Sequence, residues 1–292
     1  MVSERKKIKI DITYRGPLAS CDYACDYCPF AKRHDDAKAR HADESALNRF
    51  VDWVEAHQGE FEFRILITPW GEALVRKWYR QAIVRLSHLP HVAKVVIQTN
   101  LSTPVTWLED AQKDRVALWT TYHPSEISIE RFVAKTQALE AIGIEYSVGI
   151  VGKNENQIAA ARLRKALNPA TYLWINAYKD DPLHYSDQDI EYFTHIDPHF
   201  GINNQYHQSF QKECNSGVTS ISIDGSGDVK PCHFVDKHLG NIYEDNLQTI
   251  LQPCYRCPNA KCGCYIGYIH LAELGLNEIY GEKLLERIVS VS

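Results

Sequence analysis

The cysteines of this 292-residue chain fall into two groups, and this distribution limits what the chain can fold into more than any other feature. Three of the nine lie within residues 21–28, none occurs in 29–213, and six follow within 214–264. The first ten residues contain four Lys or Arg but no apolar stretch typical of a signal peptide, and no apolar run of about 18 residues occurs. We therefore expect a cytoplasmic protein, where disulfides are rare, with two separate sites at which cysteines bind metal or do chemistry.

Between the two cysteine groups, apolar stretches rich in β-forming residues alternate with helical patterns. This alternation indicates βα units and a parallel sheet. Six strands with right-handed crossovers fit either an open doubly wound sheet or a partial barrel. The predicted strands are Ile8–Tyr14, Phe61–Thr68, Val92–Thr99, Val116–Tyr122, Ile144–Val151 and Tyr172–Ala177, and the predicted helices lie near 43–58, 74–88, 127–142 and 154–166.

The pattern changes after about residue 200, which indicates a second, smaller domain. Two short strands, Ser220–Ile223 and Asp228–Lys230, flank an Asp-Gly-Ser-Gly turn and predict a hairpin. We place the boundary near 195–210, with domains over residues 1–200 and 201–292.

Two further segments carry weaker signals. The charged run Lys32–Glu44 is mixed in sign and predicts a solvated loop. The final segment, Ile266–Ser292, predicts one or two helices broken around Gly275.

The first cysteine group lies where ligands bind in α/β folds. Cys21, Cys25 and Cys28 follow the first predicted strand, and loops at the carboxyl ends of parallel strands hold ligands. Three thiolates suit zinc or an iron–sulfur cluster. A structural zinc would need a fourth protein ligand, for which His34 and His41 are the nearest candidates. A cubane held by three cysteines instead has one iron open to a substrate or cofactor.

The eight residues from Cys21 to Cys28, with the aromatic Tyr27 before the last cysteine, resemble the signature of the radical S-adenosylmethionine (SAM) superfamily. The resemblance implies that Cys21, Cys25 and Cys28 are catalytic and hold a [4Fe-4S] cluster, whose fourth iron is chelated by SAM. An electron from the cluster then cleaves SAM, and the 5′-deoxyadenosyl radical abstracts a hydrogen atom from substrate. The implied fold is a partial (β/α)6 TIM-like barrel with a small C-terminal cysteine-rich α+β domain.

Residues at the ends of successive strands also resemble SAM contacts of this superfamily. Trp70–Ala73 is similar to its Gly-Gly-Glu-Pro loop, and Gln98–Asn100 to its Thr-Asn-Gly, with Leu101 in place of the glycine. Each position also has a plain structural interpretation, such as a helix N-terminal charge, a turn residue or a strand end. The SAM site that the resemblance implies comprises Tyr27, Gly71, Glu72, Gln98, Asn100, Thr121, His123 and Val151.

The second cysteine group resembles the SPASM extension of radical SAM enzymes, or its shorter relative, the twitch domain. The opening spacing matches, but the later gaps are shorter than usual and no cysteine follows Cys264. The family's topology would put Cys214, Cys232 and Cys264 on one cluster and Cys254, Cys257 and Cys262 on another. The sequence leaves three alternatives for this site. They are two clusters, each with an open iron or a non-cysteine ligand, one cluster with two cysteines to spare, and zinc. The neighbouring histidines are expected to be surface or packing residues more than ligands: His233, His238 and His270.

The resemblance implies a radical SAM enzyme with one or two auxiliary clusters, but it does not identify the substrate. We expect a peptide or protein side chain, and alternatively a small molecule such as a sugar or aminocyclitol, with flavodoxin or ferredoxin as the reducing partner. About seven residues precede the first strand, so we expect no separate leader-peptide domain. Candidate residues near the cavity mouth are Tyr178, Asp180, Asp181, His184 and Tyr206.

Two other classes of protein are weighed against this one. The first is an iron–sulfur or zinc module without catalysis, and the second is a scaffold that binds SAM but does not cleave it. The net charge of −5 without a basic stripe argues against nucleic acid, and we expect no membrane partner.

Overall fold

The computed structural model describes residues 7–30, 33–179 and 184–290. The strands are β1 (Ile8–Arg15), β2 (Phe61–Ile67), β3 (Val92–Thr99), β4 (Val116–Tyr122), β5 (Glu145–Gly152), β6 (Leu173–Ala177), β7 (His207–Gln208), β8 (Ser220–Asp224), β9 (Asp228–Lys230), β10 (Gly240–Asn241) and β11 (Lys261–Cys262). The α-helices are α1 (Ala37–Ala56), α2 (Lys77–His88), α3 (Ile129–Ile142), α4 (Gln157–Ala166), α5 (Asp187–Ile196), α6 (Phe200–Asn203), α7 (Leu247–Ile250), α8 (Tyr265–Tyr268) and α9 (Asn277–Tyr280). Four 3₁₀ turns complete the described elements: η1 (Thr106–Asp110), η2 (Lys113–Arg115), η3 (Asn154–Asn156) and η4 (Ala272–Leu274).

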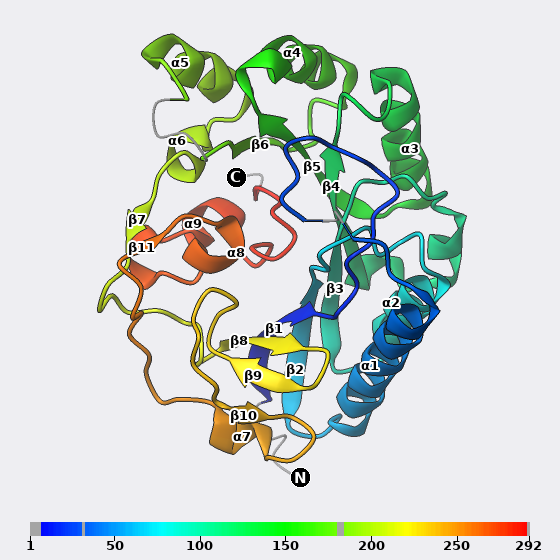
Figure 1. Ribbon diagram of the computed structural model, residues 1–292, viewed down its shortest axis with the longest axis vertical. Helices are drawn as coiled ribbons and strands as arrows, with labels where there is room; N and C mark the ends of the chain where they lie inside the picture. The colour runs from blue at the N-terminus through cyan, green and yellow to red at the C-terminus, as the bar shows by residue number, and fades with distance from the viewer. Residues whose placement is uncertain (1–6, 31–32, 180–183, 291–292) are drawn as a thin grey trace, which may run out of the picture.

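Six parallel strands, β1 to β6, lie in sequence order and form a curved sheet (Figure 1). The hairpin of β8 and β9 extends the same sheet, because β8 pairs parallel to β1. The predicted small domain is therefore continuous with the barrel sheet at this edge, and the two cysteine groups approach each other across β1.

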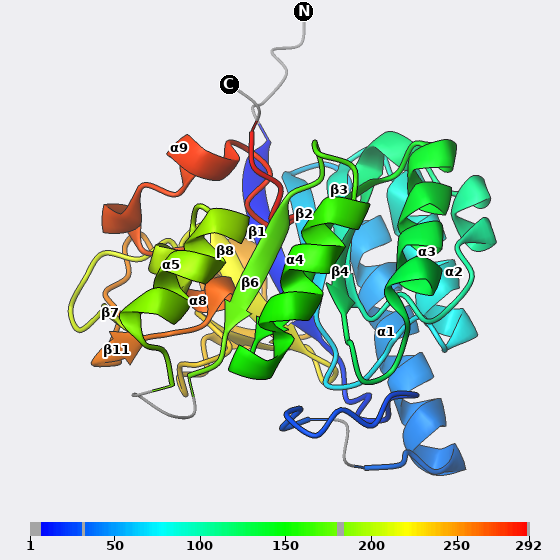
Figure 2. The ribbon, with the colours of Figure 1, turned by 90° about the horizontal axis from the view of Figure 1, so that it is seen from above.

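Helices and C-terminal segments cover opposite faces of this sheet. Figures 1 and 2 show α1 to α3 on the outer face, with the orange and red C-terminal segments on the other side. Two hydrophobic cores follow from this arrangement. The outer core includes Phe50, Ile83 and Phe132 from the helices, and the inner core packs Trp119 and Trp174 of the strands against the C-terminal segment.

The last described segment closes the barrel at the amino ends of its strands. Lys283 Nζ lies 2.7 Å from Glu145, which also pairs with Lys94 at 2.6 Å. Three residues later, the buried carboxylate of Glu286 pairs with Arg64 at 2.8 Å. Breaking a buried pair leaves an uncompensated charge, so these contacts hold the C-terminal segment inside the barrel.

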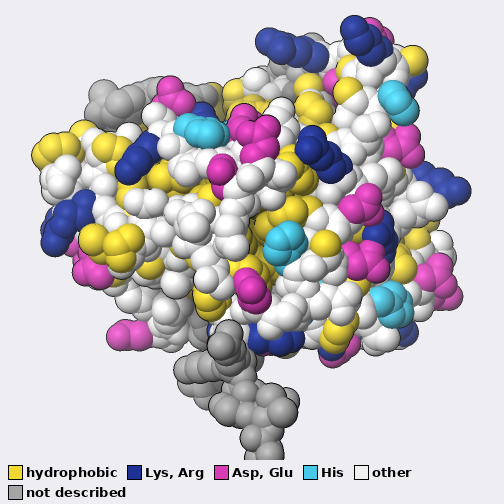
Figure 3. Space-filling model, turned by 90° about the horizontal axis from the view of Figure 1, so that it is seen from below, with side chains coloured by type: hydrophobic (Ala, Val, Ile, Leu, Met, Phe, Trp, Pro, Cys, Tyr) yellow, Lys and Arg dark blue, Asp and Glu magenta, His cyan; other side chains and the backbone are white. Residues whose placement is uncertain are grey.

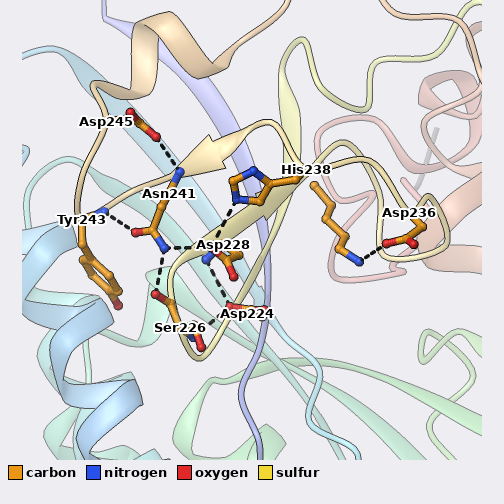
Figure 4. A network of polar contacts seen from close by, with 9 residues as sticks. Asp224, Ser226, Asp228, Asp236, His238, Asn241, Tyr243 and Asp245 are labelled. Atoms are coloured by element: carbon orange, nitrogen blue, oxygen red, sulfur yellow. Dashed lines mark hydrogen bonds and ion pairs between the residues drawn. The ribbon is translucent and has the colours of Figure 1, made fainter.

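A polar network holds the turn of the β8–β9 hairpin and its junction with β10 (Figure 4). Asp224 Oδ1 accepts from the backbone N–H groups of Ser226 and Asp228, and the Asn241 amide donates to Asp228 at 2.9 Å. Gly227 has a φ of +88°, which favours glycine. The network fixes the hairpin that lies between Cys214 and Cys232 of the second cysteine group.

The predicted six strands, four long helices and hairpin are confirmed within a few residues at their ends, except that the helix expected near 43–58 begins six residues earlier, at Ala37. The predicted solvated loop over Lys32–Glu44 is wrong for most of its length. Helix α1 begins at Ala37, where Asp36 provides the N-cap, and Asp43 is buried. The C-terminal segment forms short helical turns, with Gly275 in the left-handed region at the expected break.

Acidic and basic side chains are interspersed on the face shown in Figure 3. Within the described residues, no helix is both long and apolar enough to span a bilayer.

Candidate functional site

Two carboxylates from the α1 region hold the chain just before the first cysteine. Asp43 is buried and accepts hydrogen bonds from Leu18 N, Trp78 Nε1 and Tyr79 Oη at 3.1, 2.8 and 2.9 Å. Asp35 accepts from Ser20 N at 2.9 Å and from its hydroxyl at 2.6 Å. Neither acid is recognisable from its sequence context, since both lie in the charged run.

The loop after β2 packs directly on the same segment. Trp70 N donates to Leu18 O at 3.2 Å and Glu72 N to Ser20 O at 3.1 Å, which continues the pairing of β1 with β2. A Cβ on Gly71 would lie 1.9 Å from the Ser20 carbonyl oxygen. Only glycine allows the two backbones to approach this closely.

Replacing Gly71 by alanine should therefore displace the Ser20 backbone and the cysteine loop that follows it. We expect a loss of about 3 kcal/mol of stability and a fall of several degrees in the thermal midpoint, because a backbone atom cannot give way like a flexible side chain. Gly201→Ala is the matched control, since a Cβ there meets nothing within 4 Å. Equal midpoints for both variants in a thermal melt would contradict this packing role.

All three cysteines of the first group line one cavity of about 520 Å³. Burial raises the pKa of Cys21 to about 12 and of Cys25 to about 11, so neither thiol ionises at neutral pH without a positive partner. The other lining residues come from the ends of β1 to β4, from β6, and from the C-terminal part of the chain. An adjoining cavity of about 560 Å³ shares Cys28 and Cys264 with it.

Every residue predicted to contact SAM lines one of these two cavities. Gly71, Glu72, Gln98, Asn100, Thr121 and His123 line the first, and Tyr27 and Val151 line the second. Their roles as SAM ligands stay predictions.

The Glu72 carboxylate is buried in the cavity wall and held by three donors. One oxygen accepts from Leu74 N and Thr99 Oγ1, both at 2.9 Å, and the other from Asn100 N at 2.6 Å. Burial raises its pKa to about 7, and no Lys, Arg or His of the described chain pairs with it. A ligand cation beside it would restore the usual stability of the ionised form.

Side chains at the ends of β3 and β4 contact the cysteine loop itself. Asn100 Nδ2 donates to Asp22 Oδ1 at 3.0 Å. His123 Nδ1 lies 2.7 Å from Tyr27 Oη and 3.4 Å from Cys25 Sγ. Burial lowers the pKa of His123 to about 4, so its imidazole is neutral.

Leu101 stands where the resembled motif has glycine, and it keeps a glycine-like backbone. Its φ is +56°, its side chain is fully buried, and its N–H donates to Thr99 Oγ1 at 2.9 Å. Left-handed backbone costs a non-glycine residue about 1–2 kcal/mol, which burial of a leucine side chain offsets.

Trp70, the other departure from the motif, links the two cysteine regions. Its ring centroid lies 5.0 Å from Phe30 and 5.1 Å from His233. The Arg15 guanidinium lies 4.2 Å from its centroid. The aromatic side chain therefore fills the space between the first cysteine loop and the segment after Cys232.

Five of the six C-terminal cysteines act on one another electrostatically. Burial, together with the nearby Cys214, Cys257 and Cys264, raises the pKa of Cys232 to about 12. Burial, with smaller effects from Cys232 and the same three neighbours, raises the pKa of Cys262 to about 12. Backbone contacts support this grouping, since Cys214 N donates to Tyr255 O at 3.1 Å.

The remaining details separate two cysteines from the others. Cys254 is exposed. Cys264 is surrounded by protein but accessible through the cavities, both of which it lines. None of the nine cysteines, all of which lie in the described ranges, forms a disulfide.

The three histidines considered as extra ligands have other contacts. His270 is buried, with Nε2 3.1 Å from Ser220 Oγ, and burial lowers its pKa to about 4. His238 lies 3.3 Å from Asp228, and His233 lies 3.1 Å from Arg15. His34 and His41 are exposed.

The donor chemistry fits iron–sulfur clusters at both positions. Across the described ranges, no three His, Cys, Asp or Glu side chains converge closely enough to hold a single metal ion. The fit therefore rests on the thiol donors, on their shared cavity, and on buried thiols that gain a positive partner when iron binds. At the first group the donors are Cys21, Cys25 and Cys28, and at the second they come from the six later cysteines.

Among the other candidates, Tyr178 and Tyr206 line the second cavity. His184 packs against Tyr178 with ring centroids 4.9 Å apart. Asp180 and Asp181 lie outside the described residues. Sequence reasoning missed four residues that line the first cavity from distant elements: Arg15, Trp119, Trp174 and Arg287. A buried arginine near the C-terminus has no local sequence signal.

The C-terminal region matches a known domain. Residues 214–265 match the model of the SPASM family, described as an iron-sulfur cluster-binding domain. The matched span contains all six later cysteines. A comparison with curated proteins finds no match.

Solved structures share the fold. A structure described as native anSMEcpe with bound AdoMet aligns with a TM-score of 0.55 and 11% identity, covering 82% of this chain and 80% of that one. The same protein with bound AdoMet and Cp18Cys peptide aligns with a TM-score of 0.52 and 12% identity, covering 82% and 80%. BtrN in complex with AdoMet and 2-DOIA covers 84% and 83% at 16% identity, but its TM-score of 0.39 is too low to bear on the fold. The first two confirm the predicted partial barrel.

Proposed function

We propose that this chain is a radical SAM enzyme with an auxiliary iron–sulfur domain. The observation that supports this most is the convergence of Cys21, Cys25, Cys28 and the buried Glu72 on one cavity. Thiolates and a carboxylate without a cation are suited to a cluster with an open iron and to the ammonium group of SAM. The AdoMet bound in structures of the same fold and the SPASM match support the same function.

Each residue of the cavity has a part that follows from its contacts. A [4Fe-4S] cluster on the three cysteines would supply the electron that cleaves SAM. Glu72 would accept the SAM ammonium while Leu74 N, Thr99 Oγ1 and Asn100 N keep its carboxylate oriented. The neutral His123, held by the Tyr27 hydroxyl, would bind as a hydrogen-bonding group and not as a charge.

The test is reductive SAM cleavage by the wild-type chain. After anaerobic reconstitution with iron and sulfide, we expect 5′-deoxyadenosine to form only when a strong reductant is added, with flavodoxin or ferredoxin as the physiological donors. Failure to cleave SAM at full iron content would leave a metal-binding module or a non-cleaving scaffold as the better description.

We further propose a peptide or protein side chain as the substrate. Exposed aromatic side chains, Phe30, Tyr206 and Phe234, line the adjoining cavity and offer contacts to an extended ligand. A structure of the same fold is described with a bound peptide. A small-molecule substrate is the second candidate, favoured by the limited volume of about 520 Å³ beside the first cysteines.

For the second site we propose a single four-cysteine cluster on Cys214, Cys232, Cys257 and Cys262. These four are buried or half-buried and lie near enough to affect one another's pKa, whereas Cys254 and Cys264 are exposed. Cys264 would then be a cavity residue and not a ligand. This grouping differs from the three-plus-three topology that the resemblance implies.

Replacing Cys257 by alanine should remove about four irons per chain, whereas Cys254→Ala should keep them. Both variants should still cleave SAM reductively, because the first cluster is intact. Cys257→Ala should lose substrate turnover if the auxiliary cluster takes part in it. Equal iron loss in both variants, measured by iron and sulfide analysis, would support two three-cysteine clusters and contradict the single-cluster proposal.

A further inference from the structure

Arg287 is a buried cation with no polar partner in the described structure. It comes from the C-terminal segment that enters the barrel, and its side chain is 1% exposed. Its guanidinium carbon lies 4.0 Å from the ring centroid of Trp174, 4.1 Å from Tyr265 and 5.4 Å from Trp119. Within the described ranges, no hydrogen bond or ion pair reaches its guanidinium, and its Nε is buried without a partner.

Burial of this guanidinium is unfavourable unless a hydrogen-bond acceptor binds to it. The face of an aromatic ring attracts a guanidinium group, but the ring offers no hydrogen-bond acceptor for the five N–H groups of the arginine. Burying unpaired donors together with an unpaired charge is strongly unfavourable. A residue kept there despite that cost calls for an acceptor that binds in the cavity.

The neighbouring acids are already engaged. Glu286, the preceding residue, pairs with Arg64. The two Asp197 oxygens accept from Tyr172 Oη at 2.8 Å and from Ile175 N at 2.9 Å, and Asp197 lies beyond ion-pair distance from Arg287. The acceptor is therefore not supplied by the acids nearest to Arg287.

A second cation, Arg15, lines the same cavity. Its Nε donates to Thr68 Oγ1 at 3.3 Å and its Nη1 lies 3.1 Å from His233 Nε2. No carboxylate of the described residues pairs with it. Two guanidinium groups on one cavity, neither of them neutralised by an acid, favour a ligand with an oxyanion.

The position of Arg287 separates it from the predicted SAM contacts. Trp119 and Trp174, which pack on it, each lie two residues before a strand-end cavity residue, Thr121 on β4 and Asn176 on β6. Side chains two residues apart on a strand point to the same side, so Arg287 lies deeper in the barrel than those strand ends. SAM anchored at Glu72 would occupy the upper level.

We propose that the cavity binds the substrate through a carboxylate or phosphate group, with Arg287 as its principal ligand and Arg15 as a second cation. The identification of this ligand as the substrate rests on the proposed radical SAM function. The oxyanion would insert below SAM and place the rest of the substrate between the two cysteine groups.

The test measures anion binding to the reconstituted full chain with SAM at saturation. Succinate and inorganic phosphate are titrated separately by calorimetry into the wild type, Arg287→Gln, Arg287→Met and the control Arg256→Gln, whose side chain is exposed and donates to Gln211 O. We expect one or both anions to bind the wild type and the control, and to bind each Arg287 variant at least about tenfold more weakly. Binding of succinate alone identifies a carboxylate and binding of phosphate alone a phosphate.

Thermal melts and iron analysis of the Arg287 variants test whether this arginine has only a structural role. Replacing an unpaired buried charge by methionine should leave the thermal midpoint unchanged or raise it, and the iron content should stay at the wild-type value. The proposal is overturned if neither anion binds the wild type, if the variants bind as tightly, or if the variants lose iron, which would show that Arg287 balances cluster charge.

Two further readouts keep this proposal separate from the proposed function. The same titration is repeated without SAM. Anion binding that is seen without SAM but is lost at saturating SAM would assign Arg287 to the SAM carboxylate and overturn the substrate proposal. If the wild type cleaves SAM but binds no anion, the inference fails while the radical SAM function stands. If it binds the anion through Arg287 but never cleaves SAM, the oxyanion site stands and the radical SAM function fails.

Discussion

Replacing Cys21, Cys25 and Cys28 together by alanine should remove about four irons per chain and abolish 5′-deoxyadenosine formation. All three thiols line the cavity that Glu72 also lines, and their removal leaves Cys264 as the one cysteine of that lining, too few thiols to hold a cluster. Iron and sulfide analysis after anaerobic reconstitution, followed by mass-spectrometric detection of 5′-deoxyadenosine, measures both effects.

The matched control for that triple variant is Cys254→Ala, which removes an exposed thiol from the other group. It should keep both the iron content and the cleavage of SAM. A triple variant that still forms 5′-deoxyadenosine, or that has the wild-type iron content, would rule out the assignment of the catalytic cluster to these cysteines.

Glu72→Gln should weaken SAM binding by roughly 30-fold or more. Loss of a buried partner for a charged ligand group costs about 2–5 kcal/mol, and 1.4 kcal/mol corresponds to a factor of ten. In the glutamine variant, the amide N–H₂ also faces one of the backbone N–H groups that donate to the carboxylate in the wild type, Asn100 N or Leu74 N. Two donors then face each other and that hydrogen bond is lost. Equilibrium dialysis with labelled SAM measures the change.

Glu191→Gln, an exposed substitution on α5, is the control for charge alone and should leave SAM affinity unchanged. Iron content should be the same in both variants, because Glu72 is not expected to hold iron. If Glu72→Gln binds SAM as tightly as the wild type, the carboxylate is a purely structural acceptor for the loop after β2.

The strand-end residues were predictable because their positions follow from periodicity and topology. Once the strands alternate with helices in a parallel sheet, the residues after each strand must meet at one edge. The cysteine loop, Glu72, Asn100 and His123 all lie there, in the same cavity. Resemblance to a family added the expected chemistry to positions that the fold already brings together.

Contacts between distant segments were not predictable in this way. Asp43 lies in a charged run that predicts a solvated loop, and its burial depends on Trp78 and Tyr79 of a later helix. Arg287 reaches the cavity only because the C-terminal segment enters the barrel, held by Glu286 and Arg64. No periodicity within a single element encodes such contacts.

The two departures from the resembled motifs, Leu101 and Trp70, are explained by the backbone conformation and the packing at these positions. Leu101 has a positive φ, a conformation that glycine adopts readily, so a leucine in place of the motif's glycine still allows a left-handed backbone there. Trp70 stands where the motif has a glycine, and its ring packs between Phe30 and His233. This contact links the first cysteine loop to the second cysteine region. The grouping of the six later cysteines likewise depends on how the β8–β9 hairpin extends the barrel sheet.

The central claim is that the first cluster has an open iron at which SAM binds beside Glu72. Electron paramagnetic resonance of the reduced, reconstituted wild type, recorded with and without SAM, tests this most directly. We predict that SAM changes the signal of one cluster in the wild type and that this signal is missing in the Cys21/Cys25/Cys28 triple variant. A signal from the first cluster that is identical with and without saturating SAM would contradict the account.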